Sequence, residues 1–188
     1  MFRLFGASLE TFESGVTVRG GVELQGQDIT VPGDISSATF FVVAALITPG
    51  SELLIRNVGV NPTRTGAIDI LRAMGGDITL QDQREVSGEP VADLLVRSSR
   101  LKGCAIAGSV VPRAIDEFPA ICVAAACAEG VTTIREAKEL RVKEPDRIAM
   151  SLSVAALVST GGITISDTEC VSTSFPSFYA LLEKVARG

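Results

Sequence analysis

The sequence of 188 residues contains no histidine. Histidine is the side chain whose ordinary pKa lies closest to neutrality, so its absence removes the most common acid or base of enzyme sites. Proton transfer near neutral pH must then depend on carboxylates, on lysines or on a cysteine with a shifted pKa. The candidates for catalysis are limited to these residue types.

A long apolar run is also missing. The longest one starts at Ala38 and is interrupted by Thr48, Pro49 and Gly50, well short of the ~20 residues that a membrane-spanning helix needs. The first ten residues mix charged residues and glycine with apolar ones, unlike a signal peptide. We therefore expect a cytoplasmic protein that does not enter a membrane.

Basic runs and paired cysteines are absent as well. The formal net charge is −5 and no run of Lys or Arg reaches four residues, which argues against nucleic-acid binding. The cysteines lack the CxxC spacing of zinc and redox sites, so we expect buried free thiols. They are Cys104, Cys122, Cys127 and Cys170.

The residues that are present describe a globular chain. Hydrophobic residues make up 46% and charged residues 21%, a mixture that can bury a substantial core. The length suits one ordinary domain, or two small repeats that share a core. This composition argues against disorder.

Periodicity predicts mixed helices and strands in the first half. Alternating valines, leucines and isoleucines over residues 16–31 predict strands, and residues 36–39 can cap a helix over 40–47 that is apolar on every face and therefore buried. Further predictions are a strand over 52–58, a helix over 63–74, a strand over 77–80, a polar link over 81–90 and a strand around 94–96.

The second half repeats this order. A helix cap is expected near Ile115 and Asp116, a buried helix over 120–128 and a strand over 131–134. Both halves then carry Pro-x-Arg, at Arg64 and Arg147, and both later reach a glycine pair that opens a strand. This pattern indicates an internal repeat of roughly 80–85 residues.

Three clusters carry charge in places where chemistry is expected. Asp116, followed by Glu117, lies at the start of an apolar helix and is either its N-cap or a general base with a raised pKa. Residues 139–147 hold three cations and three anions, and they form either a solvated helix start or an anion site with Lys143, Glu144 and Arg147. The weaker third cluster, 57–66, opens a helix whose N-terminus favours anions.

Five separated strings cover nearly the whole chain. They are Pro32-Gly33-Asp34-Ile35-Ser36-Ser37-Ala38, Asn61-Pro62-Thr63-Arg64-Thr65-Gly66, Ile115-Asp116-Glu117, Leu140-Arg141-Val142-Lys143-Glu144-Pro145-Asp146-Arg147, and Asp167-Thr168-Glu169-Cys170 with Ser174-Phe175-Pro176. In this order they resemble the 5-enolpyruvylshikimate-3-phosphate synthase family. The Arg-Val-Lys-Glu-x-Asp-Arg string is the family's own.

The resemblance implies a transferase of the shikimate pathway. Such an enzyme moves the enolpyruvyl group of phosphoenolpyruvate to the 5-hydroxyl of shikimate 3-phosphate and releases phosphate, without a metal or cofactor. It implies that Asp116 is the base at the hydroxyl and that Glu144 carries the proton of the methylene group. Lys143 would be a further catalytic residue that helps hold or activate the shikimate phosphate. Arg147 would anchor phosphoenolpyruvate.

The same resemblance implies an α+β fold of repeated βαβαββ units with buried helices against sheets. Residues 1–28 would be a remnant of the family's other domain with crossover strands. Residues 29–188 would form one enolpyruvyl-transferase-like domain of two units, 29–100 and 101–188. The second unit is expected to be shortened near Arg147 by an internal deletion, because the family's later Asp-His-Arg-x-Ala-Met string is fused there to the first motif.

Two other functions stay open at this stage. The chain is either an active transferase or a fragment that is non-catalytic or needs a complementary domain, supplied by self-association or by a second polypeptide. A third candidate is the UDP-N-acetylglucosamine enolpyruvyl transferase, although the Arg-Val-Lys-Glu string argues against it.

Overall fold

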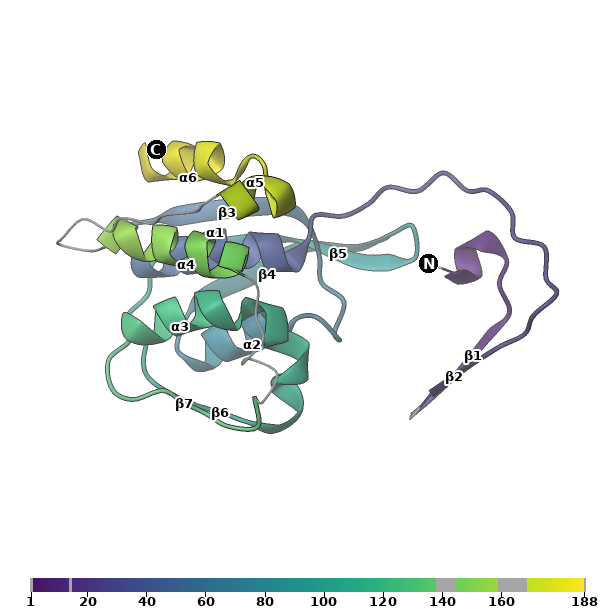
Figure 1. Cartoon of the computed structure of the whole chain (residues 1–188), viewed down its shortest axis with the longest axis horizontal. Coiled ribbons are helices and arrows are strands. Elements are labelled where there is room, and N and C mark those ends of the chain that lie inside the picture. Colours follow the sequence, from purple (N-terminus) through teal and green to yellow (C-terminus); the bar gives the residue numbers. More distant parts are fainter. Residues whose placement is uncertain (1, 14, 138–144, 159–168, 188) are drawn as a thin grey trace.

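The computed structural model describes residues 2–13, 15–137, 145–158 and 169–187. A packed body carries an N-terminal arm, residues 2–31, that extends away from it (Figure 1). The arm begins with a 3-10 helix, η1 (Phe2–Phe5), and continues with the strands β1 (Leu9–Phe12) and β2 (Gly15–Val18), which pair with each other in antiparallel fashion. The remainder of the arm is extended chain without a strand.

The prediction of strands across residues 16–31 is therefore wrong beyond Val18. A strand needs a partner for its backbone groups, and in the described chain this segment has few. Gln25 N donates to Phe5 O at 2.9 Å, and Thr30 N donates to Ser87 Oγ at 3.0 Å. The alternating apolar residues are consequently exposed.

Helix α1 (Ile35–Ile47) forms the centre of the body. It is buried on nearly all sides, which confirms the prediction made from its uniformly apolar sequence. Its N-cap is Asp34, whose carboxylate accepts from Ser37 N at 2.9 Å, and not one of residues 36–39 as expected. An aspartate in this position satisfies a free amide at the helix start.

A three-stranded antiparallel sheet lies against α1. Its strands are β3 (Glu52–Gly59), β4 (Asp77–Val86) and β5 (Glu89–Arg97), in the order β3-β5-β4. The predicted polar link over 81–90 is wrong, because β4 and β5 form one hairpin whose turn is made by Ser87 and Gly88 at φ 50° and 74°. The polar residues face solvent on the hairpin. Helix α2 (Gly66–Ala73) connects β3 to β4 and is shorter than the predicted 63–74.

Among the described residues, the second half contains less sheet than the first. The strands β6 (Ala105–Ile106) and β7 (Thr133–Ile134) form a short parallel pair. Between them lie two 3-10 helices, η2 (Gly108–Val110) and η3 (Pro112–Glu117), and helix α3 (Phe118–Ala126), which begins and ends two residues before the predicted helix. After them come α4 (Pro145–Ala155), η5 (Ala156–Val158), α5 (Glu169–Ser174) and α6 (Phe178–Arg187).

The helices surround α1 and complete one core. Helix α1 contacts α3 and α4 on one side and β3 and β5 on the other. The C-terminal helices α5 and α6 lie at the top of the body in Figure 1, where Phe178 contacts Phe40 and Phe41 with ring centroids 5.9 and 5.8 Å apart. The α+β class expected from the sequence is confirmed.

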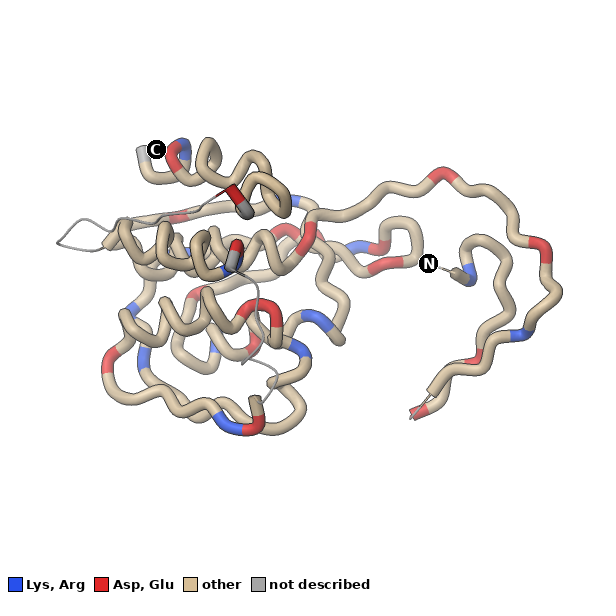
Figure 2. Tube along the Cα trace, viewed as in Figure 1, with Lys and Arg blue, Asp and Glu red and all other residues tan. Residues whose placement is uncertain are grey.

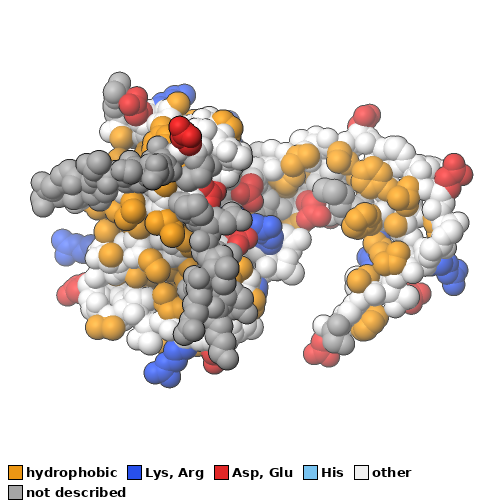
Figure 3. Space-filling model, in the orientation of Figure 1, with side chains coloured by type: hydrophobic (Ala, Val, Ile, Leu, Met, Phe, Trp, Pro, Cys, Tyr) orange, Lys and Arg blue, Asp and Glu red, His pale blue; other side chains and the backbone are white. Residues whose placement is uncertain are grey.

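Surface features differ between arm and body. Acidic and basic residues are scattered over both (Figure 2), whereas large exposed apolar side chains gather on the arm (Figure 3). None of the helices in the described part of the chain is long and apolar enough to cross a membrane.

The expected burial of cysteines is wrong for Cys122 and Cys127, which are exposed because they lie on the outer face and at the end of α3.

Candidate functional site

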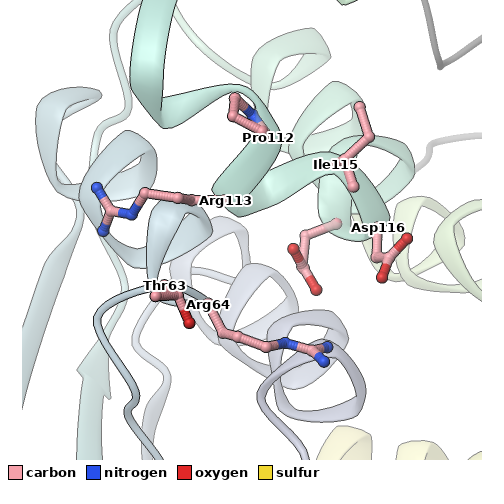
Figure 4. Close-up of a pocket in the computed structure, with 7 residues that line it drawn as sticks. Thr63, Arg64, Pro112, Arg113, Ile115 and Asp116 are labelled. Atoms are coloured by element: carbon pink, nitrogen blue, oxygen red, sulfur yellow. The ribbon is translucent and has the colours of Figure 1, made fainter. Parts of the chain in front are cut away.

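A pocket of about 180 Å³ lies between the loop that precedes α2 and the turn formed by η3. Figure 4 shows Arg64 and Arg113 pointing in opposite directions, with Asp116 on the side of Arg64. The lining residues are Thr63, Arg64, Pro112, Arg113, Ile115, Asp116 and Glu117. The pocket thus brings together the first and second halves of the chain.

Close packing and hydrogen bonds hold the two walls together. Gly66, the first residue of α2, lies against the backbone of Arg113, and a Cβ atom added there would come within 2.7 Å of Arg113 C. The Arg113 guanidinium donates to Pro62 O at 2.7 Å and to Asp69 Oδ2 at 2.6 Å. These bonds fix the loop relative to η3. They also direct Arg113 away from Asp116.

Asp116 lies near the end of η3 and faces α4. Arg147 Nη1 donates to Asp116 O at 3.2 Å, and Arg147 Nη2 lies 4.0 Å from Asp116 Oδ2. Both side chains are partly exposed. The interpretation of Asp116 as the helix N-cap is wrong, since the N-cap position of α3 belongs to Glu117 and carries no side-chain capping bond.

Glu117 is the buried carboxyl of the site, with 3% of its surface exposed. It accepts a hydrogen bond from Ser36 Oγ, and Ser36 Oγ in turn accepts one from Arg64 Nη2 at 2.9 Å. Burial raises the pKa of Glu117, the Ser36 hydrogen bond opposes this rise, and the charge of Asp116 adds to it. The sequence placed Glu117 only beside Asp116 and indicated no chemical role for Ser36.

Of the four residues predicted for the site, the described structure contains two. Asp116 and Arg147 meet although 31 residues separate them. Lys143 and Glu144 lie outside the described residues. Within the described ranges, no group of three His, Cys, Asp or Glu side chains could hold a metal ion.

Comparison with known sequences gives one consistent family. The model of EPSP synthase (3-phosphoshikimate 1-carboxyvinyltransferase) matches residues 1–150 and again 146–182. The chain is 61% identical to the 3-phosphoshikimate 1-carboxyvinyltransferase of Pelobacter propionicus over 230 residues, which cover 100% of this chain and 53% of that protein. The enzyme of the same name from Geobacter sulfurreducens is also 61% identical, over 228 residues, 99% of this chain and 53% of that protein.

A solved structure is similar over the same extent. The EPSP synthase of Acinetobacter baumannii matches with a TM-score of 0.94 at 40% identity, covering 98% of this chain and 53% of that one. The chain therefore spans about half the length of the curated relatives it matches.

Two findings of the comparisons bear on the deletion that the sequence predicts near Arg147. The two family-model matches overlap at residues 146–150, so one short stretch of this chain matches two places in the family. The alignment with the Pelobacter protein runs over 230 residues, 42 more than the 188 residues of this chain. The relative thus has residues without a counterpart in this chain, and their place near Arg147 stays a prediction.

Proposed function

The chain belongs to the EPSP synthase family, and from this premise we propose that it takes part in enolpyruvyl transfer from phosphoenolpyruvate to the 5-hydroxyl of shikimate 3-phosphate. The observation that carries the proposal is the meeting of Asp116 with Arg147 beside the pocket. A carboxylate base and a cation for a phosphate are both required by this reaction. Here the carboxylate comes from η3 and the cation from α4.

The reaction assigns a separate task to each residue. The substrate hydroxyl gives its proton to Asp116 as its oxygen bonds to the enol carbon, and the neighbouring methylene gains a proton from Glu144. In the second step the bond from the former enol carbon to the phosphate oxygen breaks, the new methyl group returns a proton to Glu144, and the departing phosphate takes up the proton held by Asp116. Lys143 and Arg147 hold the anionic groups of the two substrates, because charge-assisted contacts to phosphate are among the strongest hydrogen bonds in proteins.

In this proposal the chain supplies one wall of the site, and a complementary domain completes it. The solved Acinetobacter protein has about as much sequence again beyond the part that matches this chain. The arm exposes nine large apolar side chains: Phe2, Leu4, Phe12, Val16, Val18, Val22, Leu24, Ile29 and Val31. Exposed apolar surface of this extent is typical of an interaction site. We assign residues 1–28 to the other domain of the family and 29–188 to the domain that carries Asp116.

Phosphate release tests the proposal. The chain is mixed with shikimate 3-phosphate and phosphoenolpyruvate over a wide range of protein concentrations, with Asp116→Asn as the matched control. Release that rises more than linearly with concentration indicates completion by a second copy. Release no greater than that of the control at every concentration excludes catalysis by this chain on its own.

The second candidate function is a fragment without activity of its own. The half-length match and the overlap of the two family-model matches at residues 146–150 favour it. Calorimetric titration separates the two, since the fragment alone gives no heat with shikimate 3-phosphate while still melting cooperatively. All the relatives reported above are 3-phosphoshikimate 1-carboxyvinyltransferases, so we do not propose transfer to a nucleotide sugar. The cytoplasmic location stays a prediction.

A further inference from the structure

Three elements distant in sequence meet at one buried hydroxyl. Ser36, the second residue of α1, is 3% exposed, and its Oγ donates to Glu117 Oε1 on η3. The same Oγ accepts from Arg64 Nη2 at 2.9 Å, and Arg64 belongs to the loop before α2. One hydroxyl thereby uses its single donor and an acceptor position on two different partners.

Burying the carboxyl group of Glu117 costs free energy that burying an apolar side chain would not cost. Glu117 is a carboxyl group in an apolar core, next to the like charge of Asp116, and such a group needs a hydrogen-bond partner to remain buried. Ser36 supplies this partner, and Arg64 adds a favourable charge nearby. These contacts thus fix how η3 packs against the start of α1 and which of its side chains face Ser36.

The rotation of η3 decides where Asp116 points. In a 3-10 helix, successive side chains leave the axis about one third of a turn apart. Both carboxylate residues line the pocket, but Glu117 points to Ser36, whereas Asp116 Oδ2 lies on the side of Arg147, 4.0 Å from its Nη2. From the opposite side, Arg113 and Gly66 hold the beginning of the same turn against α2.

We propose that Glu117 is a positioning residue of the site: its hydrogen bond with Ser36 fixes η3 on the N-terminus of α1 and so directs the Asp116 carboxylate toward Arg147 and the pocket. The proposal rests on the proposed function for the role of Asp116 as base. Arg64 supports the contact by orienting the Ser36 hydroxyl. In this proposal Glu117 acts through the side chain of Asp116.

The first test needs no activity. The guanidinium NMR signals of Arg147, identified with Arg147→Lys, report its contact with Asp116. We expect Glu117→Ala and Ser36→Ala to shift these signals, and Glu117→Gln, which keeps an oxygen for the Ser36 donor, to restore the wild-type position. Glu85→Gln, at an exposed glutamate of β4, is the matched control and leaves the signals unchanged. A folded Ser36→Ala variant with wild-type Arg147 signals overturns the proposal, even where Glu117→Ala does not fold.

The second test uses turnover in a mixture with a polypeptide that carries the unmatched half of the Pelobacter relative. We expect Ser36→Ala to lower kcat by about 10- to 100-fold with little change in KM, as for a misdirected base, and Glu117→Gln to keep most of the activity. Equal kcat for Ser36→Ala and wild type overturns the proposal. If the wild-type mixture shows no turnover, the proposed function fails, and the NMR test decides the positioning role separately.

Discussion

Gly66→Ala tests how closely α2 packs on the turn that carries Asp116. The new Cβ would lie 2.7, 2.8 and 2.9 Å from Arg113 C, Arg113 O and Ala114 N, all backbone atoms that cannot rotate away. Overpacking of this kind costs about 1–3 kcal/mol. Alanine favours a helix over glycine by up to about 1 kcal/mol, which offsets part of this cost. We expect a net loss of about 1–2 kcal/mol in the free energy of unfolding.

Urea denaturation and thermal melting measure this loss. For a chain of this size, about 1–2 kcal/mol corresponds to a fall in Tm of roughly 2–8 °C. Gly20→Ala is the control, because nothing lies within 4 Å of its added Cβ, and we expect a change below about 0.5 kcal/mol. A Gly66→Ala variant as stable as the wild type, or more stable, would refute the close approach of α2 and η3.

Three further predictions concern the site and the core. Burial raises the pKa of Glu117, so protonation of this carboxyl stabilises the fold fully below the pKa of an unfolded glutamate, about 4.3, and this stabilisation is lost as pH rises through the higher folded pKa. In thermal melts, the Tm of Glu117→Gln should therefore rise relative to that of the wild type between acidic and neutral pH. A Tm difference that stays constant with pH would contradict this. Asp116→Asn removes the carboxylate beside Arg147, and partly exposed ion pairs contribute about 0–1 kcal/mol. Inorganic phosphate should therefore bind up to about fivefold more tightly to this variant in a phosphorus NMR titration. Weaker binding would show that Arg147 does not bind the phosphate. Phe178→Ala should lower the free energy of unfolding by about 3–5 kcal/mol in urea, whereas Tyr179→Ala, at an exposed neighbour, should cost much less; equal losses would contradict the packing of α6.

Local sequence was sufficient to predict an element when all of its faces lie in the same environment, buried or exposed. The apolar run of α1 predicts a buried helix because every face of that helix meets another element. The β4-β5 hairpin was missed because its polar outer half mimics a loop, and only Ser87-Gly88 indicated the turn. In the arm, the alternation over residues 16–31 predicted strands, but pairing beyond Val18 requires a partner that the described chain does not supply.

The site residues that belong to sequence motifs could be predicted, whereas those brought together only by tertiary contacts could not. Asp116 and Arg147 were selected from the sequence, and the structure places them together. The Ser36 contact with Glu117 spans 81 residues and that with Arg64 spans 28, so neither periodicity nor spacing could reveal it. A glutamate directly after Asp116 was the only signal, and it did not indicate which way each carboxyl would point.

The central claim is that this chain carries the Asp116 wall of an enolpyruvyl-transfer site and needs the rest of the family's sequence to act. Phosphate release in a mixture of this chain with the unmatched half of the Pelobacter relative tests it most directly. We predict release that requires both polypeptides, shikimate 3-phosphate and phosphoenolpyruvate, and that Asp116→Asn abolishes. No release from the mixture, or equal release with Asp116→Asn, would contradict the claim.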